Sequence, residues 1–103
     1  QEIPHGQQSA MDYVLDGDVE LREIQHKIEQ AEAGDDGVLL ATLHAELDNV
    51  GGYTANARAS QLLAGLGFRQ VDESRSIDEF SGGWRMRLNL GKALMCRSDL
   101  LII

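Results

Sequence analysis

Residues 80–87 read Phe-Ser-Gly-Gly-Trp-Arg-Met-Arg, and a periodic apolar run follows them along the chain. We expect Ser81 to cap a helix, because its hydroxyl can accept a backbone N–H one turn into that helix. Gly82 and Gly83 are unusual in a first helical turn, since glycine costs up to about 1 kcal/mol relative to alanine inside a helix. Two adjacent glycines favour close approach of another group to the backbone, and a helix amino end favours an anion such as phosphate. A tight turn that merely starts a core helix is the alternative.

Length and composition indicate one small domain or a piece of a larger one. The chain has 103 residues, of which 43% are hydrophobic and 25% charged, as is ordinary for a soluble globular protein. No apolar run approaches the roughly 18 residues that a membrane span needs. The single cysteine, Cys96, excludes an internal disulfide, and its apolar neighbours predict a buried structural thiol. The spacing of the three histidines fits neither a metal site nor a catalytic dyad, so we expect no metal ligands.

The net charge of −8 is unevenly distributed. Residues 1–17 carry −3, residues 18–50 carry −7 and residues 51–103 carry +2. The acidic segment alone is therefore a poor candidate for nonspecific nucleic-acid binding. The basic excess surrounds the Ser-Gly-Gly helix, where an anionic ligand would need it.

Helical spacing of apolar residues predicts an α-hairpin in the acidic segment. Ser9 is expected to cap a short helix that Gly17 ends, and Asp18 to cap the next one. Helices over about 18–33 and up to about residue 50 are joined by a short turn at residues 34–37, so they must lie antiparallel. The side chains predicted to face inward are Leu21, Ile24, Ile28, Ala31, Leu39, Leu40, Leu43, Leu47 and Val50.

Two further helices and one strand are expected after the hairpin. A helix is predicted over residues 53–66, and Phe68 should anchor the polar loop that follows. The last helix is expected from about Gly83 to Cys96, and its periodic apolar residues are Leu88, Leu90, Ala93, Leu94 and Met95. Residues 100–103 read Leu-Leu-Ile-Ile, which predicts a buried strand of a parallel sheet. Because no other segment offers that strand a partner, we expect the chain to be a fragment of a larger α/β domain.

Taken in order, these motifs resemble the nucleotide-binding domain of ABC-type ATPases between its Q-loop and its Walker B strand. The family signature Leu-Ser-Gly-Gly-Gln corresponds to residues 80–84, Phe-Ser-Gly-Gly-Trp. The Trp84 variant, followed by Arg-Met-Arg-Leu-x-Leu, is similar to the ABC-F subfamily. Residues 16–18, Asp-Gly-Asp, and residues 62–68, Leu-Leu-Ala-Gly-Leu-Gly-Phe, strengthen the resemblance, which is closest to the YheS-type bacterial branch. It covers essentially all 103 residues.

The resemblance implies a mainly α fold, namely the helical (signature) subdomain of an ABC-type P-loop ATPase domain. The implied segments are the Q-loop exit with a short helix (1–17), an arm-like α-hairpin (18–50), a helix and loop (51–80), the signature motif and its helix (81–96) and the start of the Walker B strand (99–103).

The resemblance also implies a function for the intact protein. Ser81, Gly82, Gly83 and Trp84 would bind ATP held by a second ATPase domain, with the Ser81 hydroxyl and the Gly83 N–H on its γ-phosphate. Gln1 would be the Q-loop glutamine. ABC-F proteins are soluble, cytoplasmic translation factors that couple ATP hydrolysis to the ribosome. The expected partners are therefore the second ATPase domain and the ribosome (rRNA, tRNA and ribosomal protein), and the expected cofactors are ATP and Mg²⁺.

The chain departs from a complete ATPase in two respects. It contains no G-x-x-x-x-G-K-[ST] phosphate loop, and it ends before any Walker B acidic pair. We therefore expect the fragment alone to be inactive, to hold no cofactor and to self-associate through its apolar tail.

Several alternatives stay open at this point. Arg85 and Arg87 either steer phosphate or rRNA or are solvated or salt-bridged. Trp84 either contacts an adenine or a facing domain or is a packing anchor. The alternatives for the whole chain are an ATPase subunit of an ABC transporter and a stand-alone helical interaction module without a nucleotide role.

Overall fold

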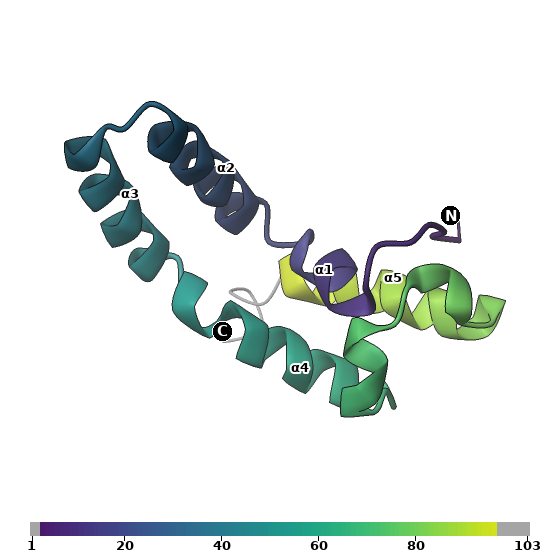
Figure 1. Cartoon of the computed structure of the whole chain (residues 1–103). Helices are drawn as coiled ribbons and strands as arrows, with labels where there is room; N and C mark the ends of the chain where they lie inside the picture. Colours follow the sequence, from purple (N-terminus) through teal and green to yellow (C-terminus); the bar gives the residue numbers. More distant parts are fainter. Residues whose placement is uncertain (1–2, 97–103) are drawn as a thin grey trace.

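The computed structural model describes residues 3–96 and shows a mainly α protein (Figure 1). Its α-helices are α1 (Ala10–Leu15), α2 (Val19–Ala33), α3 (Gly37–Asn49), α4 (Ala55–Gly65) and α5 (Gly82–Cys96). Three 3-10 helices lie in the connections: η1 (Gly52–Thr54), η2 (Gln70–Ser74) and η3 (Ile77–Glu79). Within residues 3–96 there is no strand, only an isolated bridge between Ser9 and Ser76. The predicted mainly α fold is confirmed, whereas the strand expected at 100–103 lies outside the described residues.

Side-chain oxygens cap the amino ends of the first three helices. Ser9, Asp18 and Asp36 each accept the backbone N–H of the residue three positions later, at 3.1–3.2 Å. These bonds satisfy N–H groups that have no acceptor inside the helix. The predicted caps at Ser9 and Asp18 are confirmed.

Helices α2 and α3 lie side by side as an antiparallel hairpin, called the arm below, which projects from the other helices (Figure 1). The turn between them places Asp35 at a φ of +55°, a left-handed conformation that Asp tolerates better than most residues. The arm interior is a narrow apolar seam, as predicted; its buried members are Leu21, Ile24, Ile28, Ala31, Leu43 and Leu47.

Three side chains that belong to apolar patterns of the sequence are exposed. Leu39, 44% exposed, lies in the first turn of α3 at the arm tip, where α2 ends. Leu90, 50% exposed, follows the fully buried Leu88 by two positions, which turns it about 200° around the α5 axis. Cys96 is exposed at the last residue of α5, so the predicted buried thiol is wrong.

Helices α1, α4 and α5 pack together as the body of the molecule and set the position of α5 (Figure 1). Val14, Leu63 and Leu88, one from each helix, are at most 1% exposed. A Cβ on Gly17 would lie 2.1 Å from the carbonyl oxygen of Lys92, so the backbones at the end of α1 and in α5 approach too closely for any side chain.

Helix α4 begins two residues later than predicted, because residues 52–54 form η1.

Candidate functional site

Ser81 caps α5, the helix that carries the signature-like residues. Its Oγ accepts the Trp84 N–H at 3.4 Å, and its carbonyl accepts the Arg85 N–H at 2.9 Å. Among residues 3–96, the N–H groups of Gly82 and Gly83 have no hydrogen-bond acceptor. Free N–H groups and the positive end of the helix dipole together attract anions, so this end of α5 fits a phosphate group.

Gly82 and Gly83 have space around them that their own chain does not fill. Both residues are exposed, and a Cβ built on either would meet no heavy atom within 4 Å. Neither has the left-handed backbone conformation that requires glycine. Internal packing therefore does not explain two residues that cost up to about 1 kcal/mol each in a helix.

Trp84 anchors the amino end of α5 to the preceding loop. Its ring lies 4.9 Å from that of Phe68, edge to face, and Phe68 meets the Phe80 ring at 5.5 Å. The Arg87 guanidinium lies 4.4 Å from the centre of the Trp84 ring. Trp84 nevertheless remains 37% exposed, so part of the indole is accessible from outside.

Arg85 and Arg87 donate hydrogen bonds to backbone carbonyls near the site. Arg85 Nε reaches the Phe80 oxygen at 2.9 Å, and Arg87 Nη1 reaches the Leu66 oxygen at 3.0 Å. Gly67 next to Leu66 has a φ of +98°, and a Cβ there would lie 3.1 Å from Arg87 Nη1. Both arginines thus brace the loop against α5, and steering of phosphate or rRNA by their charge stays a prediction.

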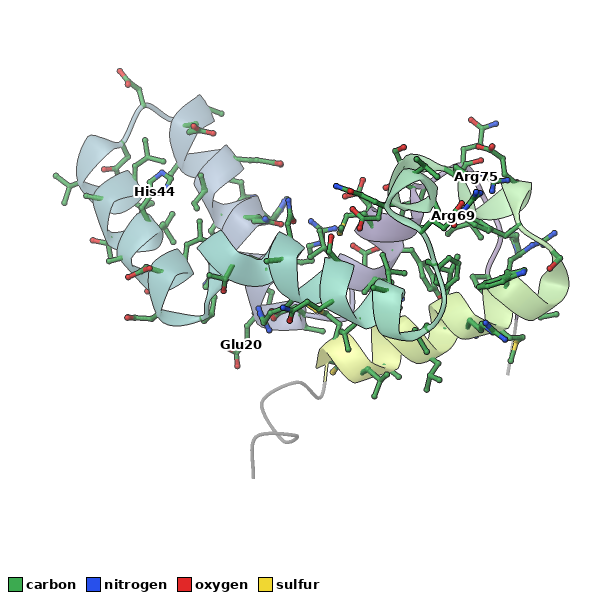
Figure 2. All side chains as sticks on the ribbon, turned by 90° about the horizontal axis from the view of Figure 1, so that it is seen from below. Glu20, His44, Arg69 and Arg75 are labelled. Carbon is green, nitrogen blue, oxygen red and sulfur yellow. The ribbon has the colours of Figure 1, made fainter. Side chains whose placement is uncertain are left out.

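Arg75 is a residue near the site that sequence reasoning missed. Figure 2 shows Arg69 and Arg75 close together on the loop between α4 and α5, far from His44 on the arm. Arg75 bridges Asp72 and Glu79, and the three- and four-residue spacing of these charges was the signal available in the sequence. Arg75 and Ser81 also line an open pocket of about 510 Å³.

Hydrogen bonds keep the two carboxylates around Arg75 ionised. The backbone N–H of Arg69 and then the Arg75 guanidinium hold the pKa of Asp72 below its ordinary value. The backbone N–H and hydroxyl of Ser76, followed by Arg75, lower the pKa of Glu79. Both carboxylates are therefore charged partners of Arg75 at neutral pH.

Comparison with known proteins identifies the family. The sequence pattern described as "ABC transporter" matches residues 6–103. The chain belongs to the ABC transporter family.

Its relatives support a narrower assignment within that family. The "Probable ATP-binding protein YheS" of Escherichia coli (strain K12) is 47% identical over 103 residues, and the protein of that name from Haemophilus influenzae is also 47% identical. The "ATP-binding cassette sub-family F member 3" of Rattus norvegicus is 39% identical over 111 residues. Each match covers 100% of this chain and 16% of the relative. The resemblance to the ABC-F subfamily is confirmed, and the chain spans about one sixth of the length of these relatives.

Gln1, the predicted Q-loop residue, lies outside the described residues, and its role stays a prediction. Within residues 3–96, no group of three or more His, Cys, Asp or Glu side chains is arranged to hold a metal ion. The same part of the chain has no helix that is both long and apolar enough to cross a membrane.

Proposed function

We propose that the amino end of α5 contacts the γ-phosphate of ATP that a second ATPase domain of the intact protein holds. The observation that carries this proposal is the open space at Gly82 and Gly83, where a built Cβ meets nothing within 4 Å. An exposed helix start with free N–H groups and no side chains in front of them fits an incoming phosphate.

Ser81 and Gly83 supply the hydrogen bonds. The Ser81 oxygen accepts the Trp84 N–H, which leaves its hydroxyl hydrogen available for an outside acceptor. The Gly83 N–H donates beside it, and the helix dipole adds to the attraction. Hydrogen bonds to a charged phosphate contribute about 1.5–3 kcal/mol each.

These contacts couple domain closure to ATP. Because the phosphate belongs to another domain, the bonds form only when the two domains come together, so ATP stabilises the closed arrangement. In the intact protein we propose that this closure drives ATP hydrolysis and acts on the ribosome during translation in the cytoplasm. This part rests on the ABC-F relationship. Mg²⁺ with ATP and the Q-loop Gln1 complete the site there.

Substitution of Gly83 by alanine tests the proposal, because it separates function from stability. A Cβ at Gly83 meets no neighbour, so Gly83→Ala should leave the fold intact and stabilise α5 by up to about 1 kcal/mol. In the full-length protein it should nevertheless lower ATP hydrolysis at the site that uses α5 by about tenfold or more. The added methyl group would keep the phosphate away from the Gly83 N–H, and loss of one charged hydrogen bond has that size. Single-turnover kinetics measures the hydrolysis step separately from product release.

Gly37→Ala is the matched control. Like Gly83, Gly37 lies in the first turn of a helix, here α3, and a Cβ there likewise meets nothing within 4 Å. This variant should gain similar stability and keep its rate of hydrolysis within a factor of about two. Equal rates in Gly83→Ala and Gly37→Ala would reject the phosphate contact and favour a helix start without a nucleotide role.

A further inference from the structure

Arg75, labelled in Figure 2, makes four contacts around the segment that leads into Ser81. Its Nη1 donates to Asp72 Oδ1 at 3.2 Å and its Nε to Glu79 Oε1 at 3.4 Å. Its Nη2 donates to the backbone carbonyl of Glu79 at 3.2 Å, and Cζ lies 4.7 Å from the centre of the Phe80 ring. One guanidinium thus holds two carboxylates, a backbone carbonyl and an aromatic ring.

We propose that Arg75 is a positioning residue that holds Ser81 where it can meet the γ-phosphate. The inference rests on the proposed function of Ser81. Glu79 and Phe80 are the two residues before Ser81, so fixing the Glu79 carbonyl and the Phe80 ring fixes the backbone direction into α5. Arg75 acts through these two residues and does not touch ATP.

Ser81 needs such support because its own surroundings hold it weakly. Its side chain is exposed, and the hydrogen bond that its Oγ accepts is 3.4 Å long. Gly82 and Gly83 follow it, and glycine has more backbone freedom than any other residue. The order of Ser81 must therefore come from the segment that precedes it and from the turn of α5 that follows the two glycines.

Arg75 can provide this order because it is itself anchored to the body. Its carbonyl accepts the Ala10 N–H at 2.9 Å, which ties the loop to α1. Its partner Asp72 is 7% exposed and accepts the Arg69 N–H at 2.9 Å. A planar guanidinium has donors in several fixed directions, whereas a lysine ammonium is a point charge that cannot reproduce this set.

Two neighbouring arginines, Arg85 and Arg69, differ from Arg75 in the contacts that they make. Arg85 holds the Phe80 carbonyl from the α5 side, so the segment before Ser81 is held from both directions. Arg69 lies on the same loop and reaches the same Asp72, at 3.6 Å, but its side chain is 75% exposed and has no described contact with Glu79 or Phe80. Arg69 is therefore a matched control for charge and for the Asp72 contact.

The test compares four variants of the full-length protein: Arg75→Ala, Arg75→Lys, Arg69→Ala and Arg22→Ala. Arg22 makes contacts of the same kinds as Arg75, with the carboxylates of Asp12 and Asp16 and with a backbone carbonyl, but at the junction of α1 and α2. Steady-state ATP hydrolysis gives kcat and KM, and hydrogen exchange of the peptide over residues 80–84 reports the order of the signature residues. Thermal melting measures any general loss of stability.

We expect Arg75→Ala to lower kcat by about tenfold or more with KM for ATP unchanged, because a misplacement of about 1 Å can cost a factor of about 100. Exchange over residues 80–84 should accelerate in the same variant, and Arg75→Lys should recover part of both effects. Arg69→Ala should behave as wild type. Arg22→Ala should lower the melting temperature without changing kcat or the exchange over residues 80–84.

Two results would overturn the inference. One is a wild-type kcat in Arg75→Ala. The other is a loss of kcat in Arg22→Ala that equals the loss in Arg75→Ala when the two variants have the same melting temperature. Gly83→Ala separates the two proposals: normal hydrolysis in that variant rejects the phosphate contact itself. Impaired hydrolysis in Gly83→Ala together with normal hydrolysis in Arg75→Ala rejects only the role of Arg75.

Discussion

A single methyl group at Gly17 should separate the end of α1 from α5. The Cβ of Gly17→Ala would lie 2.1 Å from the Lys92 carbonyl oxygen and 3.0 Å from the Lys92 carbonyl carbon. Both are backbone atoms, so rotation of a side chain cannot relieve the clash. The two backbones must move apart by about 1 Å, which loosens the packing around Val14 and Leu88, both 0% exposed.

Overpacking of this kind costs about 1–3 kcal/mol, and the rigidity of the opposing backbone places Gly17→Ala toward the upper end. Native-state hydrogen exchange in the full-length protein measures this loss of stability. A loss of 1–3 kcal/mol raises the exchange rate of amides that open locally by about 5- to 150-fold. The acceleration should concentrate in α1 and α5 and spare the arm. Gly65→Ala, a helical position where a Cβ meets nothing within 4 Å, should change exchange little. Unchanged exchange of α1 and α5 in Gly17→Ala would refute the close contact.

Two further predictions concern charged groups. Asp18→Ala removes both the cap of α2 and the ion pair with Arg58 at 3.2 Å, whereas Asp36→Ala removes a cap alone. Asp18→Ala should therefore lower the melting temperature more than Asp36→Ala. An equal effect would show that the ion pair adds nothing to stability. The lowered pKa values of Asp72 and Glu79 mean that the unfolded chain takes up protons first as the pH falls. Their contribution to stability should be complete at neutral pH and should fade as the pH falls below the ordinary pKa values of 3.8 and 4.5. Thermal melts can follow this, because the difference in melting temperature between wild type and Asp72→Asn should shrink as the pH falls.

The local features of the fold could be predicted because their causes are local in sequence. A cap involves residues three apart, so Ser9, Asp18 and Ser81 could be recognised from residue type and spacing alone. The arm followed from two apolar seams and a turn too short for any other arrangement. The predicted burial was wrong where an apolar pattern extends to the end of the hairpin. Leu39 continues the apolar seam of α3, but it lies at the arm tip and is exposed.

The contacts that position the site depend on distant residues and were not predictable. The approach of Gly17 to Lys92 joins positions 75 residues apart, and nothing in either neighbourhood indicates it. The charges around Arg75 suggested only a polar loop, because spacing does not reveal that the guanidinium also reaches a backbone carbonyl and the Phe80 ring. For Gly82 and Gly83, the sequence showed the conformational cost, and the structure added that their own chain leaves the space empty.

The distance from Ser81 to the γ-phosphate tests the central claim most directly. It can be measured in a structure of the full-length protein trapped with ATP. We predict that Ser81 Oγ and the Gly83 nitrogen both lie about 2.7–3.2 Å from γ-phosphate oxygens of an ATP held by the other ATPase domain. A closed, ATP-bound protein in which the amino end of α5 faces solvent, or meets a surface without a phosphate, would contradict the account.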